Sequence, residues 1–248
     1  MKIVVLTGAG ISAESGLATF RDADGAWNRF DVMAVATPEG YSADPARVHC
    51  FYDRRRAQLA EVEPNAAHRA LAALERAVED AGGAFLLVTQ NVDDLHERGG
   101  SRHVLHMHGE LRRARCTGCE AVMEWDAPMG GDAGGPGRGA PCPRCGEALR
   151  PHVVWFGEIP FGQDRIERAI ADADWFVAIG TSGEVYPAAG YTALARRCGT
   201  RTLEINLAAS GSAAIFDERR YGPATETVPA WVADVREHLS AAKREAHG

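Results

Sequence analysis

The polar side chains best placed for chemistry lie directly after an apolar run, residues 85–88, which is typical of a buried strand. Gln90, Asn91 and Asp93 stand at the carboxyl end of that run, where ligands bind in open α/β sheets. Gln and Asn offer paired hydrogen-bond donors and acceptors, and Asp offers an anionic acceptor. Together the three side chains suit a planar amide ligand.

Two histidines, His106 and His108, lie on a second extended run that Gly109 follows. Side chains two residues apart on a strand point to one face, so we expect both imidazoles on the same side. A histidine here could also be a surface residue or a satisfied core residue. The neighbouring polar strand end favours a functional role.

Two Cys-x-x-Cys pairs predict a metal site. The pairs are Cys116 with Cys119 and Cys142 with Cys145, and 22 residues lie between them. That gap is slightly longer than the common zinc-ribbon spacing of about 15–20 residues, and a Gly- and Pro-rich stretch at 129–141 accounts for the excess. Four thiolates complete the tetrahedral coordination of Zn²⁺ and leave no position for water, so we predict a structural zinc.

A glycine turn, Gly8-Ala9-Gly10-Ile11-Ser12-Ala13, follows the first apolar run. It fits the pattern G-x-G-x-x-(G/A), in which glycines let backbone N–H groups approach a pyrophosphate at the start of a helix. A plain tight turn gives the same short pattern. The acidic residue that normally ends a second strand is missing, because Asp22 and Asp24 fall in a polar loop. We therefore expect a dinucleotide held differently from that of a hydride-transfer dehydrogenase.

That polar loop, residues 17–27, contains Phe20 and Arg21. Such a loop can close over a ligand, with Phe20 as an apolar lid and Arg21 as a phosphate partner. The alternative is a structural loop with one buried aromatic side chain.

An expected helix at residues 45–62 carries Tyr52 and Arg55 three positions apart, on one face. The flanking Arg54 and Arg56 are expected on a solvated face, which is the ordinary place for a run of arginines.

Small polar groups end several other expected strands. The run Val153–Phe156 ends at Gly157, and its backbone could pair with an incoming peptide as an added strand, or it could be a buried strand. Gly180-Thr181-Ser182 follows the run 175–179, and Asn206 ends the run 202–206.

Apolar runs alternate with expected helices along the chain, which predicts an α/β fold with a doubly wound parallel, Rossmann-like sheet. We expect helices after the glycine turn and at 45–62, 66–79, 164–172 and 228–242, with another opening at 186–190. The zinc ribbon and the segment 34–64 interrupt the alternation. We therefore expect a smaller lobe from 34–64 and 114–149, and a larger domain from 1–33, 65–113 and 150–248.

Composition restricts the class of protein. The chain has 248 residues, 46% of them hydrophobic and 25% charged, as expected of a globular protein. A net charge of −7 disfavours nonspecific nucleic-acid binding as the main role. No run approaches the ~18 apolar residues that span a membrane, and a strand begins almost at once, so we expect no targeting segment and a cytoplasmic protein. The single cysteines, Cys50 and Cys198, are expected to be inert core residues.

Taken together, these motifs resemble the sirtuin family, the NAD-dependent protein deacylases, over about residues 2–235. The resemblance rests on the glycine turn, Thr19-Phe20-Arg21, Thr89–Asp93, His108-Gly109, the four cysteines, Val153–Glu158, Gly180–Ser182 and Asn206. Tyr52 and Arg55 further resemble the class III branch, and the overall pattern is similar to that of bacterial members.

The resemblance implies a reaction that consumes NAD as a co-substrate. The oxygen of an acyl-lysine attacks C1′ of the nicotinamide ribose and nicotinamide leaves. The ribose 2′-hydroxyl and water then complete the release of lysine and 2′-O-acyl-ADP-ribose. Class III members imply succinyl- and malonyl-lysine as substrates besides acetyl-lysine.

The resemblance also implies roles for residues. His108 would be the general base, while Asn91 and Asp93 orient nicotinamide and water. Residues implied to contact the acyl-lysine substrate are Tyr52, Arg55, Val154, Phe156, Gly157 and Glu158, with the small side chain of Ala36 leaving room for a longer acyl chain. Residues implied to contact NAD are Gly8, Ala9, Gly10, Ser12, Phe20, Arg21, Gln90, Asn91, Val92, Asp93, Gly180, Thr181, Ser182, Asn206, Leu207, Ala208 and Ala224.

Two other functions compete with this one. A nicotinamide-dependent dehydrogenase would keep NAD intact, but the chain lacks the acidic strand end of that class. A noncatalytic NAD- or ADP-ribose-binding module would have no use for His108 or for an intact lid motif. The expected partners are acyl-lysine proteins or peptides, without sequence-specific nucleic acid and without a membrane.

Overall fold

The computed structural model describes residues 1–17, 32–130 and 139–245. At its centre is a six-stranded sheet in the order β3-β2-β1-β7-β8-β9, with every neighbouring pair parallel. The strands are β1 (Lys2–Thr7), β2 (Ala84–Thr89), β3 (Val104–His106), β7 (Trp175–Ile179), β8 (Arg201–Asn206) and β9 (Glu218–Tyr221). Because β2 and β3 lie on one side of β1 and the later strands on the other, the predicted doubly wound fold is confirmed.

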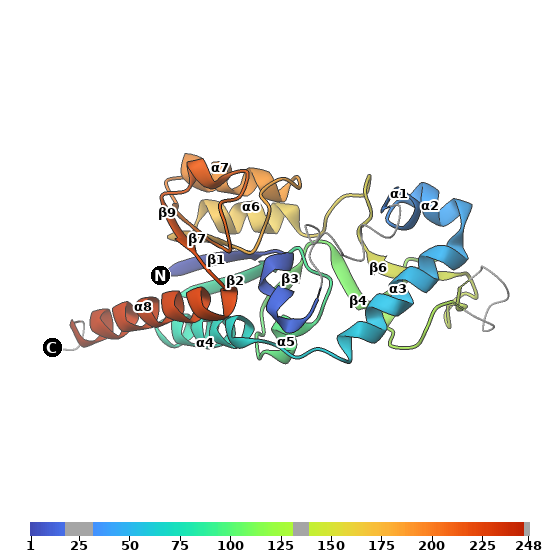
Figure 1. The fold of residues 1–248 in the computed structure, drawn as a ribbon, viewed down its shortest axis with the longest axis horizontal. Helices are drawn as coiled ribbons and strands as arrows, with labels where there is room; N and C mark the ends of the chain where they lie inside the picture. Colours follow the sequence, from blue (N-terminus) through green and yellow to red (C-terminus); the bar gives the residue numbers. More distant parts are fainter. Residues whose placement is uncertain (18–31, 131–138, 246–248) are drawn as a thin grey trace.

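Helices cover both faces of this sheet (Figure 1). On one face, Val5 of β1 packs with Leu71 and Trp231 from two helices. On the other face, Leu6 packs with Ile166. Both faces are buried, which is why the strands read as continuous apolar runs instead of alternating patterns. The covering helices are α4 (Ala66–Asp80) and α8 (Ala224–Glu245) on the first face, and α6 (Gln163–Ala171) and α7 (Tyr191–Arg197) on the second.

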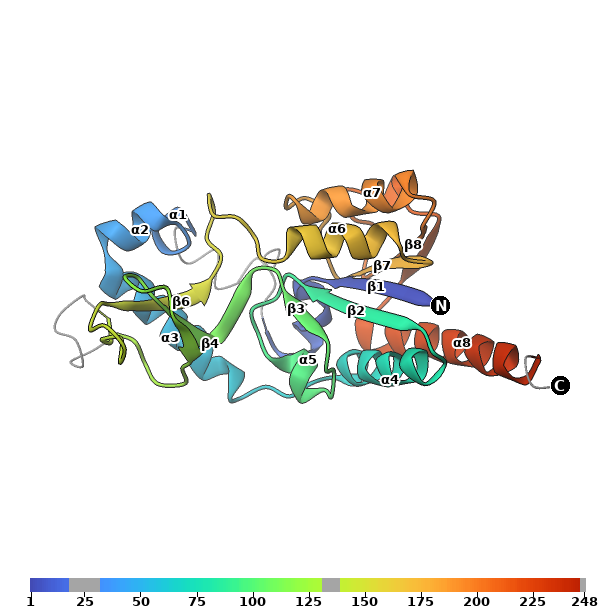
Figure 2. The same cartoon turned by 180° about the vertical axis from the view of Figure 1, so that it is seen from behind.

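A smaller lobe lies at one end of the large sheet (Figures 1 and 2). Its sheet has three antiparallel strands in the order β5-β4-β6. A separate apolar core joins its longest helix to this sheet through Phe51, Leu111 and Trp155. The elements of the lobe are α1 (Val32–Val35), α2 (Pro38–Ala43), α3 (Pro45–Leu59), β4 (Gly109–Cys116), β5 (Val122–Glu124) and β6 (Leu149–Val153).

Short elements complete the described chain. They are α5 (Leu95–Arg98) and the 3₁₀ helices at Ala9–Ile11, Ala13–Ser15, Ala188–Gly190 and Ala213–Ile215. Within the described ranges, no helix is both long and apolar enough to cross a membrane.

Several local expectations were wrong. Two 3₁₀ turns, and not an α-helix, follow the glycine turn within the described residues. The strand expected at 153–156 is β6, which ends at Val153. Helix α8 begins at Ala224, four residues before the expected start, because the Glu14 carboxylate accepts hydrogen bonds from the backbone N–H and hydroxyl of Thr225 and caps its first turn.

Three surface assignments also need correction. Arg56 is not solvated: it is 6% exposed, its Nε donates to the Leu111 carbonyl at 2.8 Å, and its Nη1 contacts Asp53 at 2.6 Å. It therefore fastens α3 to β4. Cys50 and Cys198 are exposed, and so are not core residues. The domain boundaries stay a prediction; β4 and β6 run across two of them, at 113/114 and 149/150.

Candidate active site

A cavity of about 830 Å³ lies between the carboxyl ends of the central strands and the smaller lobe. Every residue that the sequence implied for NAD or substrate contact lines this cavity, except Phe20 and Arg21, which fall outside the described residues. At its small-lobe end lie Ala36, Tyr52 and Arg55. At its β8 end lie Asn206, Leu207, Ala208 and Ala224. The fold thus brings together residues that are up to 216 positions apart (224 − 8).

The glycine turn reaches the floor of the cavity by close backbone packing. A Cβ on Gly10 would stand 2.7 Å from the Cα of Gly180, and one on Gly8 would stand 2.8 Å from the Gly180 carbonyl oxygen. The backbone N–H of Gly10 donates to that same carbonyl at 2.8 Å. Side chains at these positions would push the loops after β1 and β7 apart, so the glycines are needed to form the floor.

A buried hydrogen-bond network holds the polar groups at the middle of the cavity. The Ser12 hydroxyl donates to Asp93 Oδ2 at 3.1 Å, and the Asn91 side-chain amide donates to Ser12 Oγ at 3.1 Å and to the Gly8 carbonyl at 3.2 Å. The backbone N–H of Leu95 donates to Asp93 Oδ1 at 3.1 Å. Burial raises the pKa of Asp93, and these donors oppose that rise.

A buried histidine, His68, also contacts this network. The backbone N–H of Asn65 donates to Nδ1 of His68 at 3.2 Å, so Nδ1 is the acceptor and the neutral ring carries its proton on Nε2. Nε2 lies 3.4 Å from Ser12 Oγ. Burial lowers the pKa of His68 to about 4, which keeps the ring neutral at pH 7. Ser12 Oγ therefore accepts hydrogen bonds from His68 and Asn91, and its own proton is donated to Asp93.

His108 has the tautomer that a base requires. Its Nδ1 lies 3.1 Å from the Gln90 carbonyl oxygen, and a carbonyl can only accept, so Nδ1 carries the proton. The lone pair of Nε2 is then available to accept a proton. Burial lowers the pKa of His108, so the ring is neutral at pH 7.

The expected single extended run through His106 and His108 was wrong, because β3 ends at His106 and His108 lies in the turn before β4. Its Nδ1 contacts the Asn91 carbonyl at 3.1 Å, and its Nε2 contacts Glu97 at 2.7 Å. His106 does not line the cavity. It therefore supports the loop after β2, and the two histidines have different roles despite their shared spacing.

Polar side chains also join the loops at the β8 end. The Gln90 side-chain amide donates to the Thr181 hydroxyl at 2.9 Å, and the Asn206 side-chain amide donates to the Thr181 carbonyl at 2.8 Å. The ends of β2, β7 and β8 are therefore tied together at Thr181.

The small-lobe end combines apolar side chains with three polar ones from α3, Tyr52, Arg55 and Gln58. Tyr52 is 2% exposed, and the indole N–H of Trp155 donates to its hydroxyl oxygen at 3.0 Å. That bond occupies the oxygen as an acceptor and leaves the hydroxyl proton to donate elsewhere. Burial raises the pKa of Tyr52 to about 12, so the phenol stays protonated. One helical turn further, Arg55 lines the same space.

In the segment after β6, backbone N–H groups are already hydrogen-bonded within the protein. The backbone N–H of Val154 donates to the His108 carbonyl at 2.8 Å, and that of Phe156 donates to the Ala36 carbonyl at 2.9 Å. Glu158 accepts two hydrogen bonds from the Arg150 guanidinium and one from the backbone N–H of Trp155. A peptide added as a strand would therefore have to use carbonyl groups here, because these N–H groups are engaged.

The four predicted metal ligands converge away from the cavity. The Sγ atoms of Cys116, Cys119, Cys142 and Cys145 all lie within 4.8 Å of one another. The Sγ atoms of Cys116 and Cys145 are 3.4 Å apart and those of Cys119 and Cys142 are 3.8 Å apart, near the spacing that four thiolates 2.3 Å from one Zn²⁺ would have. Backbone N–H groups also point at the sulfurs, from Gly118 at 3.3 Å, for example. The cluster fits a structural Zn²⁺ and confirms this part of the prediction.

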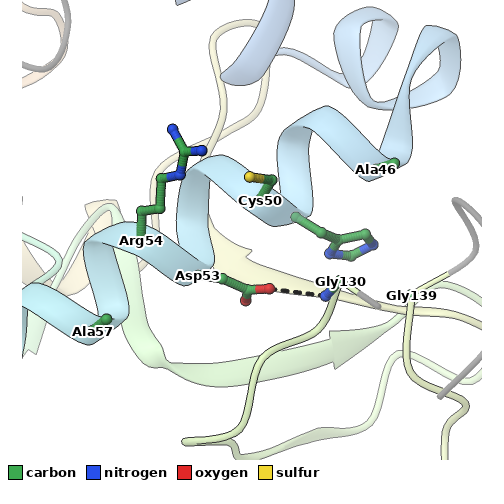
Figure 3. A pocket seen from close by; sticks show the side chains of 8 residues that line it. Ala46, Cys50, Asp53, Arg54, Ala57, Gly130 and Gly139 are labelled. Carbon is green, nitrogen blue, oxygen red and sulfur yellow. Dashed lines mark hydrogen bonds between the residues drawn. The ribbon is translucent and has the colours of Figure 1, made fainter. Parts of the chain in front are cut away.

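A second, smaller cavity of about 440 Å³ lies on α3, beside Gly130 and Gly139 (Figure 3). Cys50, Asp53 and Arg54 line it, and the Asp53 carboxylate accepts a hydrogen bond from the Gly130 N–H at 2.8 Å. None of the residues implied for NAD or substrate lines it, so the larger cavity is the candidate active site.

Sequence reasoning missed Trp155 and Glu14. In the sequence, Trp155 is only one residue of an apolar run. A buried indole N–H needs a hydrogen-bond acceptor, and this requirement could have indicated a hydroxyl nearby. Glu14 lines the cavity and caps a helix more than 200 residues later; no local signal in the sequence reports that contact.

The chain is similar to known proteins along most of its length. The model of the Sir2 family matches residues 8–187. An NAD-dependent protein deacylase of Caulobacter vibrioides is 58% identical over 232 residues, which cover 94% of this chain and 95% of that protein. A mutant of a Sir2 homologue in complex with ADP ribose has a TM-score of 0.86 at 41% identity, covering 96% of this chain and 93% of that one. Another mutant, in complex with 2′-O-acetyl ADP ribose, has a TM-score of 0.85 at 40% identity, with the same coverage. The chain therefore belongs to the Sir2 family, the NAD-dependent protein deacylases that its motifs resemble.

Proposed function

We propose that this chain removes acyl groups from lysine side chains of proteins, with NAD as the co-substrate, and that it accepts succinyl and malonyl groups as well as acetyl. The products are nicotinamide and 2′-O-acyl-ADP-ribose. One observation carries the proposal: Tyr52 and Arg55 line the small-lobe end of the cavity that Asn91, Asp93 and His108 also line.

The nicotinamide part of NAD is placed at the middle of this cavity. Asn91 and Asp93 are held there by Ser12, with both side chains fixed by hydrogen bonds before any ligand arrives. A pre-organised amide and carboxylate can orient a planar amide and a water molecule without a further ordering cost. His108, close by on the same cavity, accepts a proton from a ribose hydroxyl through Nε2.

The acyl group of the substrate is placed at the small-lobe end. Ala36 is 5% exposed and lines this end with only a methyl group, so a chain longer than acetyl has room. The Arg55 guanidinium can hold a carboxylate with two parallel hydrogen bonds, and the Tyr52 hydroxyl can donate a third. Acetyl-lysine needs neither group, so it remains a substrate.

The experiment is a wild-type assay that follows nicotinamide release from NAD in the presence of one peptide carrying acetyl-, malonyl-, succinyl- or unmodified lysine. We expect release with all three acylated peptides and none with the unmodified peptide. Release with the acetylated peptide alone would reduce the protein to a plain deacetylase, and NAD conversion to NADH would indicate a dehydrogenase.

A further inference from the structure

The indole ring of Trp155 connects the small-lobe end of the cavity to a buried ion pair outside it. Trp155 is 2% exposed and lines the cavity, and its indole N–H donates to the Tyr52 hydroxyl at 3.0 Å. The Arg150 guanidinium lies over the same ring, with its Cζ 3.4 Å from the ring centroid. Arg150 does not line the cavity. The indole therefore contacts a polar group of the cavity and also a cation outside it.

Arg150 is held in this position by several hydrogen bonds. Its Nη1 and Nη2 donate to the two carboxylate oxygens of Glu158 at 2.6 Å and 3.0 Å, and Nη2 also donates to the Val153 carbonyl at 2.9 Å. The same carboxylate accepts a hydrogen bond from the backbone N–H of Trp155 at 2.9 Å. Because a bidentate pair fixes the plane of a guanidinium, the indole packs on a cation of fixed orientation.

The Tyr52 hydroxyl accepts one hydrogen bond, and in the described part of the chain nothing accepts its proton. A phenol does not direct its proton toward an N–H group that donates to the same oxygen. The proton is therefore directed away from Trp155, and Tyr52 lines the cavity. Donation to the phenol oxygen also polarises the O–H bond, which makes the proton a stronger hydrogen-bond donor.

We propose that Trp155 is a positioning residue for acyl selectivity: held by Arg150 and Glu158, it turns the Tyr52 hydroxyl proton toward the carboxylate of a succinyl or malonyl group. This rests on the proposed function, which places the acyl group beside Tyr52 and Arg55. Acetyl-lysine has no carboxylate for the hydroxyl to bind, so Trp155 affects that substrate through packing alone.

A purely structural role for Trp155 predicts a different pattern. Its ring belongs to the core of the smaller lobe, together with Phe51 and Leu111. Loss of packing there would impair both acyl forms of a peptide alike. An effect that passes through the Tyr52 hydroxyl changes the selectivity instead, and it disappears when that hydroxyl is absent.

The test is a double-mutant cycle on the ratio of kcat/KM for the succinyl form to that for the acetyl form of one peptide. The proteins are wild type, Trp155→Phe, Tyr52→Phe and the double variant. Trp155→Phe removes the indole N–H and keeps an aromatic ring. We expect it to lower the ratio about three- to tenfold, which is the contribution of one ordinary hydrogen bond. In the Tyr52→Phe background, the same change should leave the ratio within about twofold.

A second variant tests the ion pair and covers the case in which Trp155→Phe does not fold. Arg150→Lys keeps a positive charge for Glu158 and loses the planar group that lies over the indole. It should lower the ratio less than Trp155→Phe does, and only where Tyr52 is present. Arg115→Lys is the matched control, because Arg115 contacts the same carboxylate at 3.4 Å and does not line the cavity. It should keep the wild-type ratio.

Two outcomes would overturn the assignment of Trp155. One is an unchanged ratio in Trp155→Phe, or in Arg150→Lys if Trp155→Phe does not fold. The other is a ratio in the double variant that falls by the product of the two single effects, because Trp155 would then act independently of Tyr52. Wild type that acts on the acetyl peptide and on neither the succinyl nor the malonyl peptide would overturn the proposed acyl preference, and with it this assignment. The wild-type assay alone therefore tells the two failures apart.

Discussion

Replacing Tyr52 by Phe tests the small-lobe end of the cavity in two independent ways. The substitution removes one hydroxyl and keeps the aromatic ring, which packs in the lobe core with Phe51 at a ring-centroid distance of 5.0 Å. Two hydrogen bonds should be lost: the one that Trp155 donates to the hydroxyl, and the one that the hydroxyl donates to an acyl carboxylate. The first affects stability, and the second affects substrate selectivity.

The stability effect follows from burial. Trp155 and Tyr52 are each 2% exposed, so the indole N–H is left without its acceptor in a dry environment. An unsatisfied buried donor costs about 1–3 kcal/mol. For a chain of 150–250 residues, each kcal/mol lowers Tm by about 2–4 °C, so the expected decrease is about 2–12 °C in a thermal melt.

The selectivity effect is read from kcat/KM for succinyl and acetyl versions of one peptide. A hydrogen bond to a charged group contributes about 1.5–3 kcal/mol, so the succinyl peptide should lose roughly 10–150-fold relative to the acetyl peptide. Tyr41→Phe is the matched control, because Tyr41 packs on Trp155 at 5.2 Å and does not line the cavity. It should leave the ratio unchanged. An equal loss for both peptides in Tyr52→Phe would refute the reasoning.

Two further predictions concern the metal and the base. Cys142→Ser should lower the zinc content well below one equivalent and unfold the smaller lobe, because metal binding energy is folding energy; Cys50→Ser should keep both zinc and fold, and a full zinc equivalent in Cys142→Ser would disprove the site. His108→Ala should keep ADP-ribose binding but lose turnover by about 10²–10⁴-fold. Because burial lowers the pKa of His108, wild-type kcat/KM should fall with decreasing pH only below pH 6.5, as the neutral base becomes protonated. An acid limb above pH 6.5, or a His108→Ala rate within threefold of wild type, would remove His108 from this role.

The large sheet was predictable because its strands are buried on both faces. The apolar runs at 3–6, 85–88, 175–179 and 202–206 coincide with β1, β2, β7 and β8. Strand β9 was missed because it is an edge strand, and Glu218-Arg219-Arg220-Tyr221 alternates between half-buried and exposed positions instead of forming an apolar run. Strand β4 was missed for a similar reason, since its arginines at 112, 113 and 115 hide a half-buried pattern.

The sequence predicted which residues line the cavity, but it did not predict the hydrogen bonds that hold them in place. Short motifs at strand ends identified the residues that line the cavity, because parallel strands bring their carboxyl ends to one edge. The contacts that fix those residues join distant positions. Trp155 with Tyr52, His68 with Ser12, and Glu14 with Thr225 each depend on the finished fold. Arg56 is a similar case, because the sequence of three consecutive arginines does not show which side chain is buried.

The most direct test of the proposed acyl preference is Arg55→Met, which removes the guanidinium and keeps an unbranched apolar side chain beside Tyr52. The measurement is kcat/KM for succinyl and acetyl forms of one peptide, in wild type and variant. Arg54→Met is the matched control, because Arg54 lies one position away and lines the smaller cavity instead. We predict that Arg55→Met lowers desuccinylation roughly 10–150-fold more than deacetylation, and that Arg54→Met lowers neither. If Arg55→Met reduces both activities equally, this arginine does not bind the acyl carboxylate, and the protein is a deacetylase without a dicarboxylate pocket.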